Sequence, residues 1–138
     1  MKVLVLTNLI HDITKISSFI VQSLLGDKNE VIVMITFDLP RGVTDDDLLE
    51  THDRIKNKAE DFVKKLSDQV GPSIKISPVI KMGRLDYVLR NFLKNNDCNL
   101  IIMGGQNIEL ANKIVPIIKK NKIEVIDIEK MEALRVSS

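Results

Sequence analysis

Five short, largely apolar runs alternate with four stretches of helical spacing, and this alternation constrains the fold of the 138-residue chain more than any other feature. The runs are rich in β-branched residues and cover residues 2–7, 30–37, 74–82, 98–103 and 123–128. Apolar runs bounded by turn residues are typical of strands in a parallel sheet. The alternation therefore predicts a single α/β domain over residues 1–138, with helices on both faces of the sheet. Residues 129–138 form a tail with no pattern that predicts its structure.

Capping residues and apolar spacing define the four expected helices. Asp12 is placed to cap the first helix, and Thr44 opens the longest one, whose first turn contains Asp45–Asp47. The last helix begins at Asn107, and Pro116 should kink or split it because proline removes a hydrogen bond and clashes one turn back. The longest helix is expected to bury one apolar stripe: Leu48, Ile55, Ala59, Phe62, Leu66 and Val70.

Pro78 falls inside the third run and favours an edge position for that strand, because proline cannot donate to an interior hydrogen-bond ladder. The expected strand order is therefore 3-2-1-4-5, with right-handed crossovers. Parallel sheets of this kind bind ligands beyond the carboxyl ends of the strands, where the strand order reverses. The candidate site is the crevice between the first and fourth strands. Its expected walls are Thr7, Asn8, His11 and Asp12 on one side and Gly104, Gly105, Gln106 and Asn107 on the other.

The turn after the fourth run is the best candidate for an anion site. Gly104 and Gly105 precede Asn107, and two backbone N–H groups at a helix start would accept a phosphate or a carboxylate. The same glycines would equally serve a tight turn that needs a positive φ. Three cationic side chains near this edge would also be candidates to contact an anion, but they are equally well explained as surface charge: Lys81, Arg84 and Lys113.

Composition argues against several classes of function. A net charge of +1 gives no argument for binding nucleic acid or a membrane surface. Cys98 is the only cysteine, which excludes an internal disulfide and suits a reducing compartment. No apolar run approaches the roughly 20 residues of a membrane span, and the first residues do not resemble a signal peptide. These features predict a cytoplasmic protein.

Catalytic and metal-binding patterns are weak. His11 beside Asp12 has two interpretations, a pair that contacts a ligand or a solvated histidine next to a helix cap. His52 lies on the stripe of the longest helix and is expected to be packed, and the acids of Asp45–Asp47 are explained by the helix dipole. No metal site is expected, because the two histidines are distant and have no further ligands at suitable spacing. The sequence also contains no nucleophile elbow or P-loop lysine.

Two segments resemble the universal stress protein family. Val79–Gly83 is similar to the third strand of the family and its closing glycine, and Asp97–Gly104 is similar to the "ADLIVMG" strand. The resemblance extends from Met1 to about Ile128. It implies a Rossmann-like (adenine nucleotide alpha hydrolase-like) three-layer sandwich, with a five-stranded parallel sheet.

The ATP-binding motif of that family is incomplete in this chain. The motif is a glycine, two residues, a second glycine, nine residues, a third glycine and then serine or threonine. Gly104 matches its first position, but the later positions fall on Asn107, Ile117 and Ile118. The family often has an aspartate that contacts the nucleoside after the first strand, where this chain has Asn8. The resemblance thus implies a member without tight ATP binding and without a bound cofactor.

The resemblance implies a stress-response or regulatory domain that is not an enzyme and acts through self-association or an unknown protein partner. Family members commonly form homodimers along the fifth strand, here Ile123–Ile128, although Glu124 and Asp127 could instead protect that edge. The alternative function is an adenine nucleotide sensor for ATP or AMP. Such a sensor would use the crevice residues Thr7, Asn8, His11, Gly104, Gly105 and Asn107. A weak phosphohydrolase built on His11 and Asp12 is a further rival.

Overall fold

A computed structural model describes residues 1–7, 13–23, 29–38, 42, 44–104 and 108–128. Its strands are β1 (Lys2–Leu6), β2 (Glu30–Phe37), β3 (Lys75–Met82), β4 (Leu100–Met103) and β5 (Glu124–Asp127). Its helices are α1 (Ile13–Ser23), α2 (Asp45–Val70), α3 (Leu85–Asn95) and α4 (Ile108–Lys120). Strands and helices alternate strictly along the chain, as the apolar periodicity predicts.

The five strands form one parallel sheet in the order β3-β2-β1-β4-β5, which confirms the predicted order. Pro78 lies in the edge strand β3, opposite Val33 of β2. A proline at this place leaves the interior hydrogen-bond ladders of the sheet intact. β1 lies at the centre of the sheet, with β2 on one side and β4 on the other.

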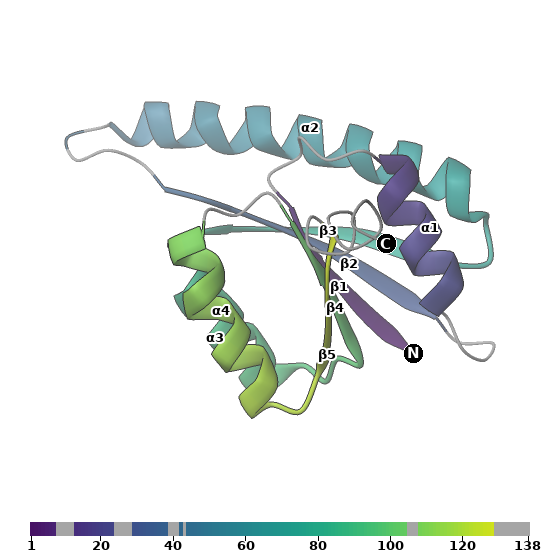
Figure 1. Cartoon of the computed structure of the whole chain (residues 1–138). Coiled ribbons are helices and arrows are strands. Elements are labelled where there is room, and N and C mark those ends of the chain that lie inside the picture. Colours follow the sequence, from purple (N-terminus) through teal and green to yellow (C-terminus); the bar gives the residue numbers. More distant parts are fainter. Residues whose placement is uncertain (8–12, 24–28, 39–41, 43, 105–107, 129–138) are drawn as a thin grey trace.

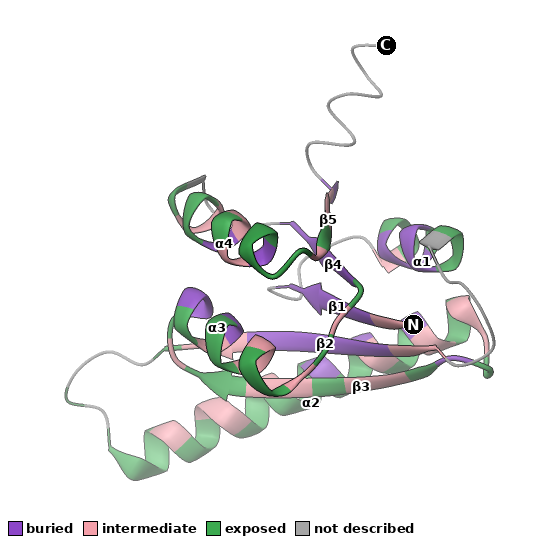
Figure 2. Ribbon diagram, turned by 90° about the horizontal axis from the view of Figure 1, so that it is seen from below, coloured by how far each residue is buried: buried purple, intermediate pink, exposed green. Residues whose placement is uncertain are grey.

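The molecule has three layers, with α1 and α2 on one face of the sheet and α3 and α4 on the other (Figure 1). Each face has its own hydrophobic core, because successive side chains of a strand point to opposite faces. In β1, Val3 and Val5 belong to the core under α1 and α2, whereas Leu4 and Leu6 belong to the core under α3 and α4. The central strands β1, β2 and β4 are largely buried (Figure 2).

The longest helix, α2, begins with a complete capping box. The Thr44 hydroxyl accepts a hydrogen bond from the Asp47 backbone N–H at 3.2 Å, and the Asp47 carboxylate accepts one from the Thr44 backbone N–H at 3.2 Å. Asp45 and Asp46 complete an acidic first turn, where negative charge interacts favourably with the helix dipole. The acidic run therefore has a structural role, as the sequence indicates.

The predicted buried stripe of α2 is only half correct. Ala59, Phe62 and Leu66 are buried, but Leu48, Ile55 and Val70 are only partly buried. Leu49, on the first turns, is 62% exposed. The helix has 26 residues and is about 39 Å long, whereas the 8-residue strand β3 beneath it spans only about 26 Å. α1 packs beside the later part of α2, and none of the described helices lies beside its first turns (Figure 1).

The prediction was that Pro116 kinks or splits the last helix, and Pro116 does not split it. α4 runs from Ile108 to Lys120 with Pro116 inside it. Pro116 and Asn112, whose carbonyl would accept the hydrogen bond that proline cannot donate, are both exposed. Water can therefore satisfy that carbonyl, and the buried residues Ile114 and Ile118 hold the opposite side of the helix on the sheet.

Candidate functional site

The predicted crevice lies where the strand order reverses between β1 and β4. Leu6 and Met103 are register partners, so Thr7 and Gly104 come next to each other at the carboxyl edge of the sheet. α1 follows β1 on one face and α4 follows β4 on the other face. This is the topological position at which parallel α/β sheets bind ligands.

Of the six predicted site residues, the structure describes Thr7 and Gly104. Thr7 is 6% exposed, and its backbone N–H donates to the Met34 carbonyl at 3.4 Å. Gly104 is also buried. The remaining predicted residues lie outside the described part of the chain: Asn8, His11, Gly105 and Asn107, together with Asp12 and Gln106. The two described residues meet at the edge, and the rest of the site stays a prediction.

The last two positions of the ATP-binding motif fall within α4, the helix that follows β4. Only residues 104–107 connect β4 to α4. Ile117, at the position of the third glycine, is partly buried within α4. Ile118, at the position of the serine or threonine, is 0% exposed and packs in the core under α3 and α4. An isoleucine that is buried in the last turn of α4 offers no hydroxyl to a phosphate.

The best-defined charged group at the carboxyl edge is at the start of α3. Arg84 donates from Nε and Nη2 to the two carboxylate oxygens of Asp86, both at 2.7 Å. Asp86 is 6% exposed, whereas the Arg84 side chain is 50% exposed. The guanidinium also lies 4.9 Å from the centroid of the Tyr87 ring, a cation–π distance.

This pair changes the interpretation of Arg84 as a free surface cation. The bidentate bond to Asp86 occupies two guanidinium nitrogens that an anion would otherwise use. The hydrogen bond from Arg84 lowers the pKa of Asp86 from 3.8 to about 2. Asp86 was missed in the sequence, although a carboxylate two residues after an arginine at a helix start is a recognisable signal.

Asp86 should make the stability depend on pH in the acid range. Its folded pKa is below the unfolded value of 3.8, so the contribution of Asp86 is present above pH 3.8 and is lost as the pH falls toward 2. Asp86→Asn should therefore lower the free energy of unfolding at pH 7. The variant should also lose less stability than the natural protein as the pH falls from 3.8 toward 2. Urea unfolding at several pH values measures this effect, with Asp97→Asn, at an exposed loop residue, as the matched control. Equal pH profiles for the two variants would contradict it.

The other titratable candidates have ordinary structural surroundings. His52 is partly buried, and its ring meets the Phe37 ring edge-on with centroids 6.1 Å apart. Burial raises the pKa of the Cys98 thiol, which donates to the Leu100 carbonyl at 3.2 Å, so the thiol is held in its neutral form. Within the described ranges, no three His, Cys, Asp or Glu residues gather as a metal site.

No described helix has the length and apolar character that are needed to cross a membrane.

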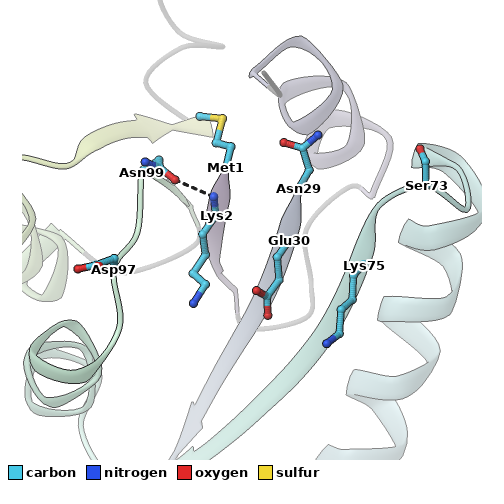
Figure 3. Close-up of a pocket in the computed structure, with 8 residues that line it drawn as sticks. All are labelled: Met1, Lys2, Asn29, Glu30, Ser73, Lys75, Asp97 and Asn99. Atoms are coloured by element: carbon cyan, nitrogen blue, oxygen red, sulfur yellow. Dashed lines mark hydrogen bonds between the residues drawn. The ribbon is translucent and has the colours of Figure 1, made fainter. Parts of the chain in front are cut away.

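A cavity of about 530 Å³ lies at the opposite, amino-terminal edge of the sheet (Figure 3). Lys2, Glu30 and Lys75 are neighbours in register on β1, β2 and β3, and their side chains project to the same side. Asp97 also lines the cavity, and the Asn99 carboxamide oxygen accepts a hydrogen bond from the Lys2 backbone at 2.7 Å. Lysine and carboxylate side chains alternate along this edge, so the cavity has no strong preference for one sign of charge.

Comparisons with solved structures place this architecture among known folds. The hypothetical protein MJ0577, studied for structure-based assignment of its biochemical function, is 20% identical, with a TM-score of 0.66 over 91% of this chain and 93% of that one. The hypothetical protein PH0823 is 14% identical, with a TM-score of 0.65 over 91% and 93% of the two chains. A protein of the universal stress protein family from Burkholderia pseudomallei is 10% identical, with a TM-score of 0.60 over 91% and 93%.

In sequence comparisons, no family model matches the chain, and no curated protein matches it. The structural likeness is below 25% identity but covers nearly the full length of each pair of chains. The chain therefore has the fold of universal stress proteins, as the resemblance in its strands implies. Because one fold supports many activities, the likeness by itself assigns no ligand or reaction.

Proposed function

We propose that this chain is a universal stress protein-like regulatory domain that acts through protein contacts, without enzymatic activity and without tight ATP binding. One observation carries the proposal: Ile118 is a fully buried core residue at the position where the family's ATP-binding motif has serine or threonine. The fold of the neighbours supports the general class of the domain.

The short connection after β4 supports the absence of tight ATP binding. Phosphate loops bind through glycine N–H groups and hydroxyls that approach the phosphate oxygens closely. Here, the residues that would supply the end of such a loop belong to α4, and one of them, Ile118, packs in the core under α3 and α4. Moving them toward a nucleotide would expose core side chains, which opposes binding.

Self-association would use β5, which is the last strand in the sheet order. β5 pairs with β4 along one side, from Leu100 opposite Glu124 to Met103 opposite Asp127. An edge strand offers backbone groups to a strand from another chain. Val125 and Ile126 are only partly buried, so a second copy would bury further apolar surface there.

A nucleotide sensor is the second candidate, and the meeting of Thr7 and Gly104 at the switch point favours it. Calorimetric titration with ATP and Mg²⁺, followed by AMP, separates the two functions. We expect no saturable heat at millimolar nucleotide from protein that is shown to be folded. Micromolar binding that Thr7→Val weakens would replace the proposal with the sensor.

The self-association part is tested by sedimentation velocity over a wide range of protein concentration, together with hydrogen exchange. Dimers that pair along β5 should protect the backbone amides of Glu124–Asp127 as the concentration rises, while amides in β3 stay unchanged. A monomer at all concentrations, or a dimer whose β5 amides exchange at the monomer rate, would remove the β5 interface.

A further inference from the structure

We propose that the first turns of α2 and the end of β3 form one docking surface for a basic amphipathic helix of a partner protein. In the described part of the chain, four large hydrophobic side chains are more than half exposed, and two of them are Leu49 of α2, at 62%, and Met82 of β3, at 58%. The inference rests on the proposed function, in which the domain acts through protein contacts. It gives those contacts a surface at the edge of the sheet opposite β5.

Two aromatic rings connect Leu49 to Met82. His52 lies one turn after Leu49 on α2, and its ring meets the Phe37 ring of β2 edge-on. Phe37 is in turn the register partner of Met82. Side chains alternate along a strand, and the residues two positions earlier on β2 and β3 belong to the core under α1 and α2, so Phe37 and Met82 project to the face that α2 covers. These four residues form the α2–β3 surface.

The α2–β3 surface lies where the layer of helices on this face is incomplete. α1 packs beside the later part of α2, whereas none of the described helices lies beside the first turns (Figure 1). Those turns are largely exposed (Figure 2). A helix of a partner would continue the layer there and cover Leu49 and Met82, as helices do when their apolar face enters a groove. Burial of this apolar surface would drive the association.

Carboxylates surround the exposed leucine. Asp45 and Asp46 lie one turn before Leu49. Asp53 lies one turn after it, and all three carboxylates are exposed. Residues 45–53 contain five carboxylates and no lysine or arginine, whereas the whole chain has a net charge of +1. The helix dipole acts only within the first turn, so it does not account for Glu50 and Asp53.

This arrangement selects the chemistry of the partner. An apolar contact that is framed by negative charge complements a helix that presents apolar side chains between lysines or arginines. Such a helix would place an apolar side chain against Leu49 and Met82 and its cations against Asp46 and Asp53. Like charges would repel an acidic helix from the same surface.

The test uses an alanine-based peptide of about 15 residues, with leucines at helical spacing along one side and lysines flanking them, and ¹H–¹⁵N NMR of the full chain. We expect saturable shifts of the backbone amides of residues 45–53 and Met82, with a dissociation constant on the order of 100 μM at low salt. Salt should weaken the binding. Two matched peptides, with glutamate for each lysine or alanine for each leucine, should bind at least about ten-fold more weakly.

Variants of the chain test the two halves of the surface. Leu49→Ser should weaken binding about ten-fold and Met82→Ser about five-fold, because each removes an apolar contact. Asp46→Asn should weaken it about two-fold at low salt. The matched controls are Val21→Ser, at a 54% exposed position of α1, and Glu60→Gln, on a later exposed turn of α2, and both should bind as the natural chain does. The same spectra show that each variant is folded.

The proposal is overturned if the peptide causes no saturable shift, if the shifts lie at another site, or if Leu49→Ser and Val21→Ser bind equally. Shifts of residues 45–53 that grow with protein concentration in the absence of peptide would assign the surface to a second copy of the chain and overturn it as well. Failure of the peptide without nucleotide binding in calorimetry would remove this surface alone. Tight ATP binding would remove the proposed function and leave the peptide result unchanged.

Discussion

Replacing Ile118 with serine should lower the free energy of unfolding by roughly 4 kcal/mol, because it removes most of a fully buried side chain and buries a hydroxyl. Ile118 is 0% exposed and packs with Ile114, Leu89 and the β4 residues Ile101 and Met103 in one core. Its neighbours belong to rigid strands and to the facing helix, so the site cannot readily collapse around the smaller residue. Denaturant unfolding followed by circular dichroism measures the change.

Ile117→Ser is the matched control, since Ile117 is the adjacent residue and is only partly buried. Ile117→Ser should lower the free energy of unfolding by roughly 1–2 kcal/mol, well below the loss expected for Ile118→Ser. The double variant Ile117→Gly/Ile118→Ser recreates the last two residues of the ATP-binding motif and should still bind no ATP. Equal costs at the two positions, or ATP binding by the double variant, would contradict the assignment of this segment to the core.

The second large expected effect is a difference in stability cost between the later part of α2, which is buried, and its first turns. Leu66→Ala should lower the free energy of unfolding by about 3 kcal/mol, because Leu66 is 0% exposed in the core under α1 and α2. Leu48→Ala, the same change on the first turns, should cost under about 1 kcal/mol because Leu48 is only partly buried. Urea unfolding of both variants tests the difference, and a comparable cost at Leu48 would mean that the first turns are anchored as strongly as the rest.

The strand order followed from few residues because its physical basis is local. Strands that are buried on both faces require apolar side chains at every position, so β1, β2 and β4 are visible as continuous runs. Pro78 restricts its strand to an edge through one missing N–H group, which any single sequence reveals. The same holds for the capping box at Thr44 and Asp47.

The errors concern features that depend on neighbours far away in the sequence. The stripe on α2 continues in the amino acid pattern to Leu48, but no helix in the described part of the chain lies beside those turns. Pro116 breaks a helical pattern locally, yet it lies on the exposed side of α4, and the buried residues of the opposite side hold the helix together. From the sequence, Arg84 was interpreted as a cation that could contact an anion or lie free on the surface, whereas the fold pairs it with Asp86.

The sequence by itself therefore determined the element order, the parallel sheet and the point between β1 and β4 where the strand order reverses, because hydrophobic periodicity, proline and glycine act within a few residues of chain. Only the tertiary structure decided that Ile118 is a core residue, that Asp86 holds Arg84, and that Phe37 of β2 meets His52 of α2. These facts depend on which helix packs over which strands, and burial and pairing are properties of that arrangement and not of any single segment.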